Sequence, residues 1–470
     1  MRALADSPAV VPAVIESTVE DLEVQRGLLD LALQPVDRFE GFTVIEQFLE
    51  SSLRYQLNYI SYALAMAQYT RAPAFTGYLA EAQRNTIDKM LDRRVWQYWA
   101  LVNLVGNLRW DPDPIVRDNV MYSGYLGVMI GLYETLNGDR RYGASGALLL
   151  RWSERRSYAY DYASLAEAIQ RNMLASATTQ YCCEPHMIFP ICNTFAINTL
   201  LMHDRLSGTD LTGDLVGQVR YSYTRDGFLR PDGRFVPGRH RLGVPLPPVL
   251  ANDALMAYWL HAAMPEETHR TWRVIRERLI RVADDGVALK LAPWERWDCG
   301  NYTLGDAMTR AFTTLIAREM GDEGTAAALE RSLEERHPAS RTGGARRYEG
   351  LSTLTSAVHA LARHNRPNAM RDLIRGALPA RWRAGPVLAH AAYAEVLVAR
   401  AVSDGEALDL VLRPANGARR TTLVVERLAP GRPHRVAGAG SAEVLAGDDG
   451  RAIVEVDLGD RVEVRIWPAR

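Results

Sequence analysis

Helical periodicity, broken at short intervals by Gly and Pro, is the feature that most restricts how this chain can fold. Between Val44 and Arg71, apolar residues recur close to the 3.6-residue helical period, and no Gly or Pro interrupts them. Pro73 disfavours the helical conformation of Ala72, the residue before it, so this helix is expected to end near Arg71. The same alternation of helix and break predicts a mainly α protein.

Further helical patterns follow with only short breaks between them. Helices are expected over residues 75–98, 116–136, 160–174, 191–206, 253–262, 267–283, 307–319 and 352–363. So many helical segments without a short sequence repeat favour helix pairs closed into a toroid, an (α/α)6 barrel with a central apolar-walled cavity. An open solenoid of stacked helix pairs is the alternative.

The C-terminal sequence is different, because β-branched runs separated by Gly and Pro turns predict strands there. These runs are residues 408–412, 420–425, 452–456 and 462–466. We therefore expect an N-terminal lead over 1–36, an α/α barrel catalytic domain over 37–404 and a small β-rich domain over 405–470. A polar, Gly- and Pro-rich stretch at 208–248, with strand-like alternation over Tyr221–Arg225, is expected to be an insertion that serves as a lid or a subunit contact.

The composition is that of a globular protein, with 47% hydrophobic residues, 24% charged residues and a formal net charge of -1. This balance gives no electrostatic attraction to nucleic acid or to an anionic membrane, so neither is expected as a partner. No apolar run reaches the roughly 20 residues that cross a bilayer, and no signal peptide is evident. The four cysteines lack disulfide-framework and zinc-site spacing, which favours a cytoplasmic protein with reduced thiols.

Residues able to do chemistry gather in two segments that we interpret as the two halves of one pocket. In the first, Cys183 and Glu184 precede a helix expected to begin near Ile191, and Cys192 falls in its first turn. The partial positive charge of a helix N-terminus favours a thiolate, whereas Glu184 disfavours a second negative charge nearby. One thiol can then serve as an acid and the other as a base. The alternative is that both are small buried hydrophobic residues.

The second segment is Met121–Tyr125, which lies within a helical pattern. Met121 and Tyr125 are four residues apart and so share one helix face. Gly124 costs about 1 kcal/mol relative to Ala inside a helix, which indicates that a ligand or another backbone approaches there. Met121 would supply an apolar wall and Tyr125 a hydrogen-bonding phenol. The alternative is an ordinary core stripe.

Other candidates are scattered along the chain. Tyr55, Tyr59 and Tyr62 follow one helix, and one of them is expected to face the cavity. Asp37 and Glu40 occupy a turn before this helix, where acidic residues are commonly solvated. Aromatic and polar clusters around Asn252 and Trp297 also suit pocket lining. The histidines show no HxH or HxxxH pair and no Gly-rich nucleotide loop is present, so neither a metal nor a phosphate cofactor is expected.

In these segments the chain resembles the linalool dehydratase-isomerase family. The resemblance rests on Arg117-Asp118-Asn119-x-Met121-Tyr122-Ser123-Gly124, on Cys183-Glu184-Pro185 with Phe189-Pro190-x-Cys192-Asn193, and on the helix that carries Tyr62. It covers about residues 37–400. Members of that family are α/α barrels that act on small terpenoid alcohols without a cofactor, and they form homo-oligomers with the site near a subunit contact. The resemblance therefore implies a homo-oligomer and a small hydrophobic substrate.

The resemblance also implies roles for individual residues. Its two active-site thiols, their neighbouring carboxylate, a pocket phenol and a pocket wall correspond in this chain to Cys183, Cys192, Glu184, Tyr62 and Met121. Asp37 and Glu40 are approximate counterparts of an acidic residue near the N-terminal junction. Tyr125 stands where the family has a histidine, so a phenol with a much higher reference pKa replaces an imidazole. This departure argues against linalool itself as the substrate.

These inferences predict a cofactor-independent lyase or isomerase. Acid-base chemistry would dehydrate, isomerise or cyclise a hydrophobic, terpenoid-like or other unsaturated natural product; covalent attack by Cys183 is also open. The expected catalytic residues are Cys183, Cys192, Glu184, Tyr125, Tyr62 and Asp37. The expected substrate-binding residues are Met121, Tyr55, His186, Phe189, Asn193 and Trp297. The alternatives are a carbohydrate-active α/α-barrel lyase, hydrolase or epimerase, which needs a polar groove with catalytic acids, and a non-catalytic binding protein with unreactive thiols.

Overall fold

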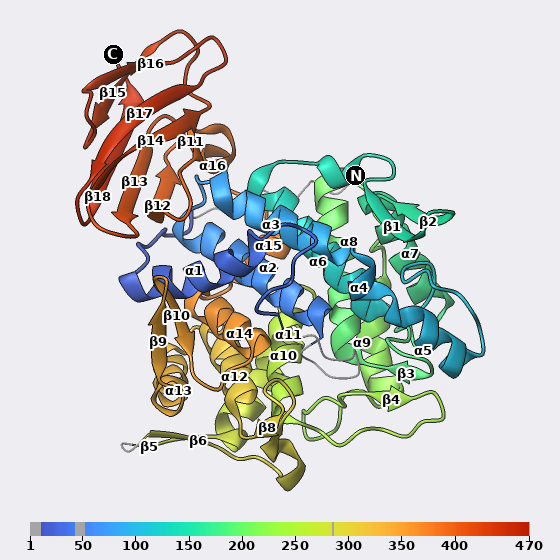
Figure 1. Ribbon diagram of the computed structural model, residues 1–470. Coiled ribbons are helices and arrows are strands. Elements are labelled where there is room, and N and C mark those ends of the chain that lie inside the picture. Colours follow the sequence, from blue (N-terminus) through green and yellow to red (C-terminus); the bar gives the residue numbers. More distant parts are fainter. Residues whose placement is uncertain (1–10, 43–51, 284–285, 470) are drawn as a thin grey trace.

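The computed structural model describes residues 11–42, 52–283 and 286–469 of this protein, and Figure 1 shows a body of helices followed by C-terminal strands. The innermost helices can be recognised from their composition. Helix α6 (Val120–Asn137) is buried at every position from Val120 to Leu136. A helix that is apolar on all sides must be surrounded by other elements. Helix α6 therefore lies inside the helical body.

A ring of helices surrounds the centre of this body. Its members are α2 (Leu53–Arg71), α6, α8 (Pro190–Ser207), α10 (Leu250–Leu260), α12 (Ala307–Glu319) and α14 (Thr353–His364). Within the described residues each of these six helices contacts the next, and α14 contacts α2, which closes the ring. Outer helices pack against them, namely α1 (Val19–Ala32), α3 (Gly77–Met90), α7 (Tyr162–Ala175), α11 (Pro265–Val274) and α13 (Glu323–Arg336).

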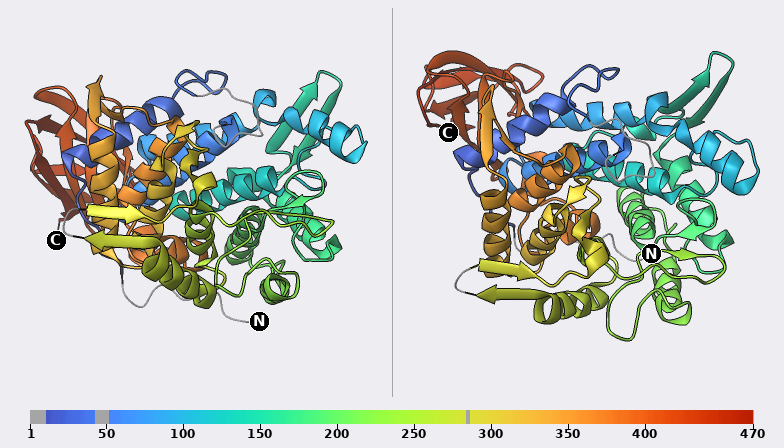
Figure 2. Two further views of the ribbon diagram at one scale, coloured as in Figure 1. Left: turned by 90° about the horizontal axis from the view of Figure 1, so that it is seen from below. Right: turned by 60° about the horizontal axis from the view of Figure 1, so that its bottom comes forward.

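Short elements connect the ring helices or project from the body. The helices are α4 (Arg93–Trp96), α5 (Tyr98–Asn107), α9 (Leu215–Arg225), α15 (Ala369–Arg375) and α16 (Ala380–Ala384). The strands form the hairpins or pairs β1 (Leu148–Ser153) with β2 (Arg156–Tyr160), β3 (Met187–Ile188) with β4 (Arg239–His240), β5 (Ile280–Ala283) with β6 (Gly286–Leu289), β7 (Trp297–Asp298) with β8 (Thr303–Leu304), and β9 (Ala339–Thr342) with β10 (Ala345–Tyr348). Figure 2 shows β1–β2 and β5–β6 on opposite sides of the helical body.

The C-terminal strands form two sheets. One contains β11 (Val387–His390), β14 (Arg419–Glu426) and β17 (Ala452–Leu458), and the other contains β12 (Val396–Ser403), β13 (Leu408–Pro414), β18 (Val462–Pro468), β15 (Pro433–Ala437) and β16 (Glu443–Leu445). Buried and exposed residues alternate strictly along β17, as expected for a strand with one face on a core. A mainly α protein with a β-rich C-terminal region, as predicted, is confirmed.

The expected boundaries of the parts need correction at both ends. Asp404 lies in the turn between β12 and β13, which pair with each other, so the β-rich region begins earlier, at β11. Helix α1 belongs to the predicted N-terminal lead, yet it packs against α2, α3 and α14 as part of the helical body. It also contacts β12, and Figure 1 shows the C-terminal strands beside it.

Most predicted helices are present, and two segments differ from the prediction. Helix α2 ends at Arg71 before Pro73, as expected, while the first residues of that predicted helix, 44–51, lie outside the described residues. The α-helix within the segment expected over 267–283 ends at Val274, a π-helix continues it over Ile275–Leu279, and the last residues form strand β5 because they pair with β6. The strand-like Tyr221–Arg225 is the end of helix α9, since Leu215, Val219 and Tyr223 are buried at helical spacing.

Glycines allow α6 and α8 to approach closely. A Cβ atom at Gly124 would lie 3.0 Å from the backbone nitrogen of Ala196, and one at Gly127 would lie 2.3 Å from Cγ2 of Thr199. The Thr199 hydroxyl donates a 3.0 Å hydrogen bond to the carbonyl oxygen of Gly124. The approach that Gly124 predicted is therefore to the backbone of α8. In the described part of the chain, no helix has both the length and the apolarity to span a membrane.

Candidate active site

The loop that leads into α8 carries both cysteines of the motif, and its own hydrogen bonds hold it in place. Asn193 accepts a hydrogen bond from the backbone N–H of Tyr181 (3.0 Å) and donates to the carbonyl oxygens of Tyr181 and Phe189 (3.1 Å each). Pro190 occupies the first turn of α8, where the missing N–H is not needed. Asn193 is fully buried in this network. It positions the loop and does not line the cavity, which corrects its expected role in substrate binding.

The two thiols of the motif face each other. Sγ of Cys183 lies 3.4 Å from Sγ of Cys192 and donates a hydrogen bond to it. Both side chains are buried. Burial raises the pKa of the Cys183 thiol well above its ordinary value, and the neighbouring Cys192 sulfur adds to this shift. Cys183 is therefore a protonated thiol at neutral pH, and Cys192 accepts its hydrogen bond.

A carboxyl group and a buried cation lie beside the thiols. Burial raises the pKa of Glu184, while the charge of Arg54 acts in the opposite direction. Arg54 is buried, with its Nη2 atom 3.3 Å from Sδ of Met121. Its guanidinium lies 4.6 Å from the ring centre of Tyr55 and 4.4 Å from that of Tyr98. Sequence reasoning missed Arg54, for which the only signal was a cation directly before Tyr55 on the helix that carries Tyr62.

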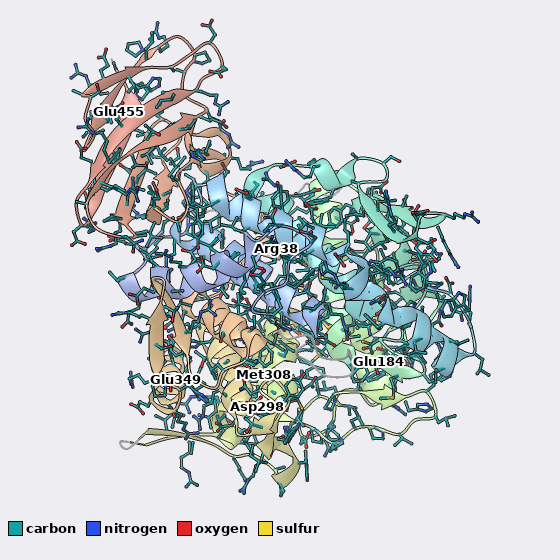
Figure 3. The ribbon with its side chains drawn as sticks, in the orientation of Figure 1. Arg38, Glu184, Asp298, Met308, Glu349 and Glu455 are labelled. Atoms are coloured by element: carbon teal, nitrogen blue, oxygen red, sulfur yellow. The ribbon has the colours of Figure 1, made fainter. Side chains whose placement is uncertain are left out.

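The two thiols, Glu184 and Met121 line a cavity of about 430 Å³ at the N-terminal ends of the ring helices. Residues with polar side chains or sulfur in its lining are Tyr55, Tyr59, Met121, Tyr125, Cys183, Glu184, Cys192, Asn252 and Met308. Apolar residues make up the remainder, namely Phe189, Ile191, Pro237, Leu246, Pro247, Val249, Ala251, Leu255, Phe312 and Leu354. Figure 3 labels Glu184 and Met308 on the lower side of the helical body, where this cavity lies.

The expected residues Tyr55, Met121, Tyr125, Cys183, Glu184, Phe189 and Cys192 thus come together in one cavity. Tyr125 stacks on Phe195 with ring centres 3.7 Å apart, and burial raises its pKa well above the ordinary value. Tyr125 therefore remains a neutral phenol. Tyr55 donates a hydrogen bond to Sδ of Met121. Tyr62 lies behind this layer, where its hydroxyl donates to the carbonyl oxygen of Tyr125 (2.9 Å), so it supports the wall without lining it.

Three further expected site residues lie outside the cavity. Asp37 is exposed, and its backbone carbonyl accepts a 2.8 Å hydrogen bond from Arg94. His186 lines a separate depression, with its Nε2 atom 3.0 Å from the carbonyl oxygen of Gly106. Trp297 is 51% exposed on β7. Their residue types suited a site, but none of the three lines the cavity.

One group of residues in the described part of the chain has the proximity that a metal site requires. Glu330, Glu334 and His359 place their ligand atoms within 4.8 Å of one another. Arg363 already lies between the two carboxylates, with Nη1 at 3.1 Å from Glu330 and 2.6 Å from Glu334. A cation thus already balances their charge, and this cluster is explained as a structural ion-pair network between α13 and α14.

Solved structures similar to this chain include two carbohydrate-active enzymes. The unsaturated glucuronyl hydrolase from Bacillus sp. GL1 is 14% identical, with a TM-score of 0.45 over 76% of this chain and 96% of that one. The GH76A alpha-1,6-mannanase from Salegentibacter sp. HEL1_6 is 13% identical, with a TM-score of 0.41 over 75% of this chain and 99% of that one.

The match to a protein family covers the ring helices and the cavity. The family model for linalool dehydratase/isomerase matches residues 54–354, which begin in α2 and end in α14. The match includes Met121, Tyr125, Cys183, Glu184 and Cys192. The chain therefore belongs to the linalool dehydratase/isomerase family.

Proposed function

We propose that this protein is a cofactor-independent lyase or isomerase that uses acid-base chemistry on a hydrophobic, terpenoid-like or other unsaturated substrate. The observation that carries the proposal is the thiol pair, with Sγ of Cys183 3.4 Å from Sγ of Cys192, beside Glu184 at the wall of a largely apolar cavity. Family membership supports the same reaction class. An apolar cavity of about 430 Å³ suits a small hydrocarbon skeleton.

The proposed proton transfers follow from the polarity of these groups. Burial raises the pKa of both Cys183 and Glu184, which shifts each group toward its protonated form, and a protonated group can donate to a leaving hydroxyl or to an alkene. Cys192 accepts a hydrogen bond from Cys183, so its sulfur already acts as an acceptor, as a group that removes a proton must. Removal of a proton from carbon by Cys192 would then complete an elimination or an isomerisation. In the elimination, water leaves from the protonated hydroxyl; in the isomerisation, the alkene gains one proton and loses another from a different carbon, so the double bond moves without loss of water.

The aromatic part of the wall fits this chemistry. Tyr55, Tyr59 and Phe312 line the cavity, as does Tyr125. Aromatic faces stabilise positive charge, which develops on carbon when a hydroxyl leaves or an alkene is protonated. Tyr125, as a neutral phenol with a raised pKa, serves as a hydrogen-bond donor and not as a base.

The closed ring of α2, α6, α8, α10, α12 and α14 with helices packed outside it supports an (α/α)6 barrel as the architecture. Carbohydrate-active enzymes use such barrels too, and they are the competing class. A glycosidase site needs a pair of carboxyl groups flanking the bond to be cleaved. Among the described residues that line the cavity, Glu184 carries the one carboxyl group. The lining therefore supports the hydrophobic substrate class.

Product analysis tests the proposed reaction. The purified protein would be incubated, without added cofactor, with a panel of terpenoid alcohols and related alkenes, and the products identified by gas chromatography with mass spectrometry. We expect loss of water or migration of a hydroxyl or double bond, and in D₂O one deuterium on carbon for each isomerisation that protonates an alkene. Hydrolysis of unsaturated glucuronides or mannosides, without turnover of any terpenoid alcohol, would instead support the carbohydrate-active class.

The pH dependence of turnover is expected to report the protonation of Glu184. If Glu184 is an acid, kcat/KM falls as pH rises through its pKa, and because burial raises that pKa, the fall lies above the value of about 4.3 for a free glutamate. Glu184→Gln should remove this decrease of kcat/KM with rising pH and lower the rate by about 10²–10⁴-fold. Arg54→Met should move the decrease of kcat/KM to higher pH, because the positive charge that lowers the pKa of Glu184 is lost. If kcat/KM of Glu184→Gln still fell with pH as in the wild type, a different group would be responsible for the decrease.

We also propose that the protein self-associates through one face of α5. Leu101, Val105 and Leu108 follow helical spacing on or just after this helix and are 63%, 70% and 89% exposed. A contiguous apolar helix face in water is characteristic of an interface. In light scattering after gel filtration, the wild type is expected as an oligomer and Leu101→Glu/Val105→Glu as a smaller species. Leu174→Glu, at a separately exposed leucine of α7, is the matched control. A monomeric wild type would contradict this proposal.

A further inference from the structure

Asn252 is the feature of the cavity that the thiol chemistry does not use. It lies in the first turn of α10, lines the cavity and is buried. Its side-chain nitrogen Nδ2 has no hydrogen-bond partner among the described residues. A buried amide without a partner is costly, and such groups in native proteins call for an explanation.

The structure of α10 does not supply that explanation. The carboxylate of Asp253 accepts the backbone N–H of Phe235 at 2.8 Å and Nε of Arg234 at 2.7 Å. Glu295 accepts the backbone N–H of Leu250, the first residue of the helix, at 2.9 Å. The start of α10 is therefore held by its neighbours, and the amide of Asn252 is not needed for capping.

The surroundings of Asn252 within the cavity are apolar. Helices α10, α12 and α14 contribute Leu255, Met308, Phe312 and Leu354 to the lining. Among the described side chains that these three helices place in the lining, Asn252 alone has N–H donors. The thiols and Glu184 come from the loop before α8 and from its first turn. Asn252 is thus a polar group of the lining that lies on a different element from the thiols and Glu184.

We propose that Asn252 binds a second oxygen function of the substrate, distinct from the one that reacts at the thiols. The inference rests on the proposed function and narrows its substrate class to apolar skeletons with two oxygen functions, such as a diol or a hydroxy-ketone. An amide can donate to either oxygen type and accept from a hydroxyl. A substrate oxygen would give Nδ2 the partner that the described protein residues do not provide. A site built in this way discriminates against analogues that lack the hydrogen-bonding group.

Binding of a matched pair of probes tests the proposal. Linalool and 8-hydroxylinalool differ by one hydroxyl at the end of the chain. Their dissociation constants would be measured by calorimetry in the Cys192→Ala background, so that turnover does not interfere. The diol is expected to bind about tenfold more tightly than linalool, as one hydrogen bond in a buried site allows. Asn252→Leu should bring the ratio to about one, while Leu255→Met, a volume-conserving change in the same wall, should keep it.

A second measurement separates a binding role from a structural one. Without ligand, Asn252→Leu is expected to melt at a higher temperature than the wild type, because it removes an unsatisfied buried amide. A lower melting temperature would show that Asn252 supports the fold and would overturn the inference. Equal binding of the two alcohols, or binding of neither, would overturn it as well. The acid-base proposal is judged independently, by the effect of the thiol variants on turnover.

Discussion

Replacing either Cys183 or Cys192 by alanine is expected to lower turnover by about 10²–10⁴-fold while leaving the fold intact. The reason is geometric. The two sulfur atoms lie 3.4 Å apart at the cavity wall, where both can exchange protons with the same bound substrate. If they work as a unit, the double variant should be scarcely slower than the slower single variant, since losses within one catalytic unit are not additive. Product formation by mass spectrometry and far-UV circular dichroism are the two measurements.

Cys182 provides the matched control for these variants. It is buried beside Cys183 in the sequence, but it does not line the cavity. Cys182→Ala removes a thiol of the same type from the same loop and is expected to retain most of the activity. Full turnover in both Cys183→Ala and Cys192→Ala would return these thiols to the role of small core residues. Equal loss in all three variants would indicate damage to the loop and not to the chemistry.

Replacing Gly127 by valine is expected to destabilise the protein by about 3 kcal/mol, at the upper end of overpacking effects. A Cβ atom there would lie 2.3 Å from Cγ2 and 2.5 Å from Oγ1 of Thr199, and the two helices must separate to accommodate it. Because α6 carries Tyr125 and α8 carries Cys192, activity should fall together with stability. Urea unfolding monitored by tryptophan fluorescence gives the free energy, and initial rates give the activity.

Gly143 serves as the control for the glycine experiment. No atom lies within 4 Å of a Cβ built at Gly143, so Gly143→Val is expected to change the free energy of unfolding by less than about 0.5 kcal/mol. If Gly127→Val were as stable as Gly143→Val, the result would contradict the close contact between α6 and α8 at Gly127. A stable but inactive Gly127→Val would show that the helix spacing matters to the site more than to the fold.

Local sequence patterns predicted many of the elements because helices and strands are short-range structures. The predicted helix over residues 307–319 has the bounds of α12, and the end of α2 follows from Pro73. The strand runs in the C-terminal region correspond to β13, β14, β17 and β18. The sequence pattern predicted the wrong secondary structure where contact with another element decides it. Strand β5 exists because β6 lies beside it, and Tyr221–Arg225 is helical because α9 buries one side.

The motif around Cys183 and Cys192 made their proximity predictable, since both flank one short loop before a helix. The sequence also placed Met121 and Tyr125 on one helix face, and the cavity contains both. Asp37 was expected at the site from the family resemblance, and His186 and Trp297 from their residue types and sequence neighbours, yet all three lie outside the cavity. Residue type indicates what a side chain can do, but the direction in which a loop carries it depends on packing.

The sequence by itself determined the class of protein, the order of its main helices and the thiol motif, because these depend on local periodicity and on residues close together in the chain. Only the tertiary structure decided which other residues meet the thiols. Tyr55, Asn252, Met308 and Leu354 lie on four different ring helices and reach one cavity because the ring closes between α14 and α2. That closure joins segments about 300 residues apart through buried apolar contacts, which no short-range pattern encodes.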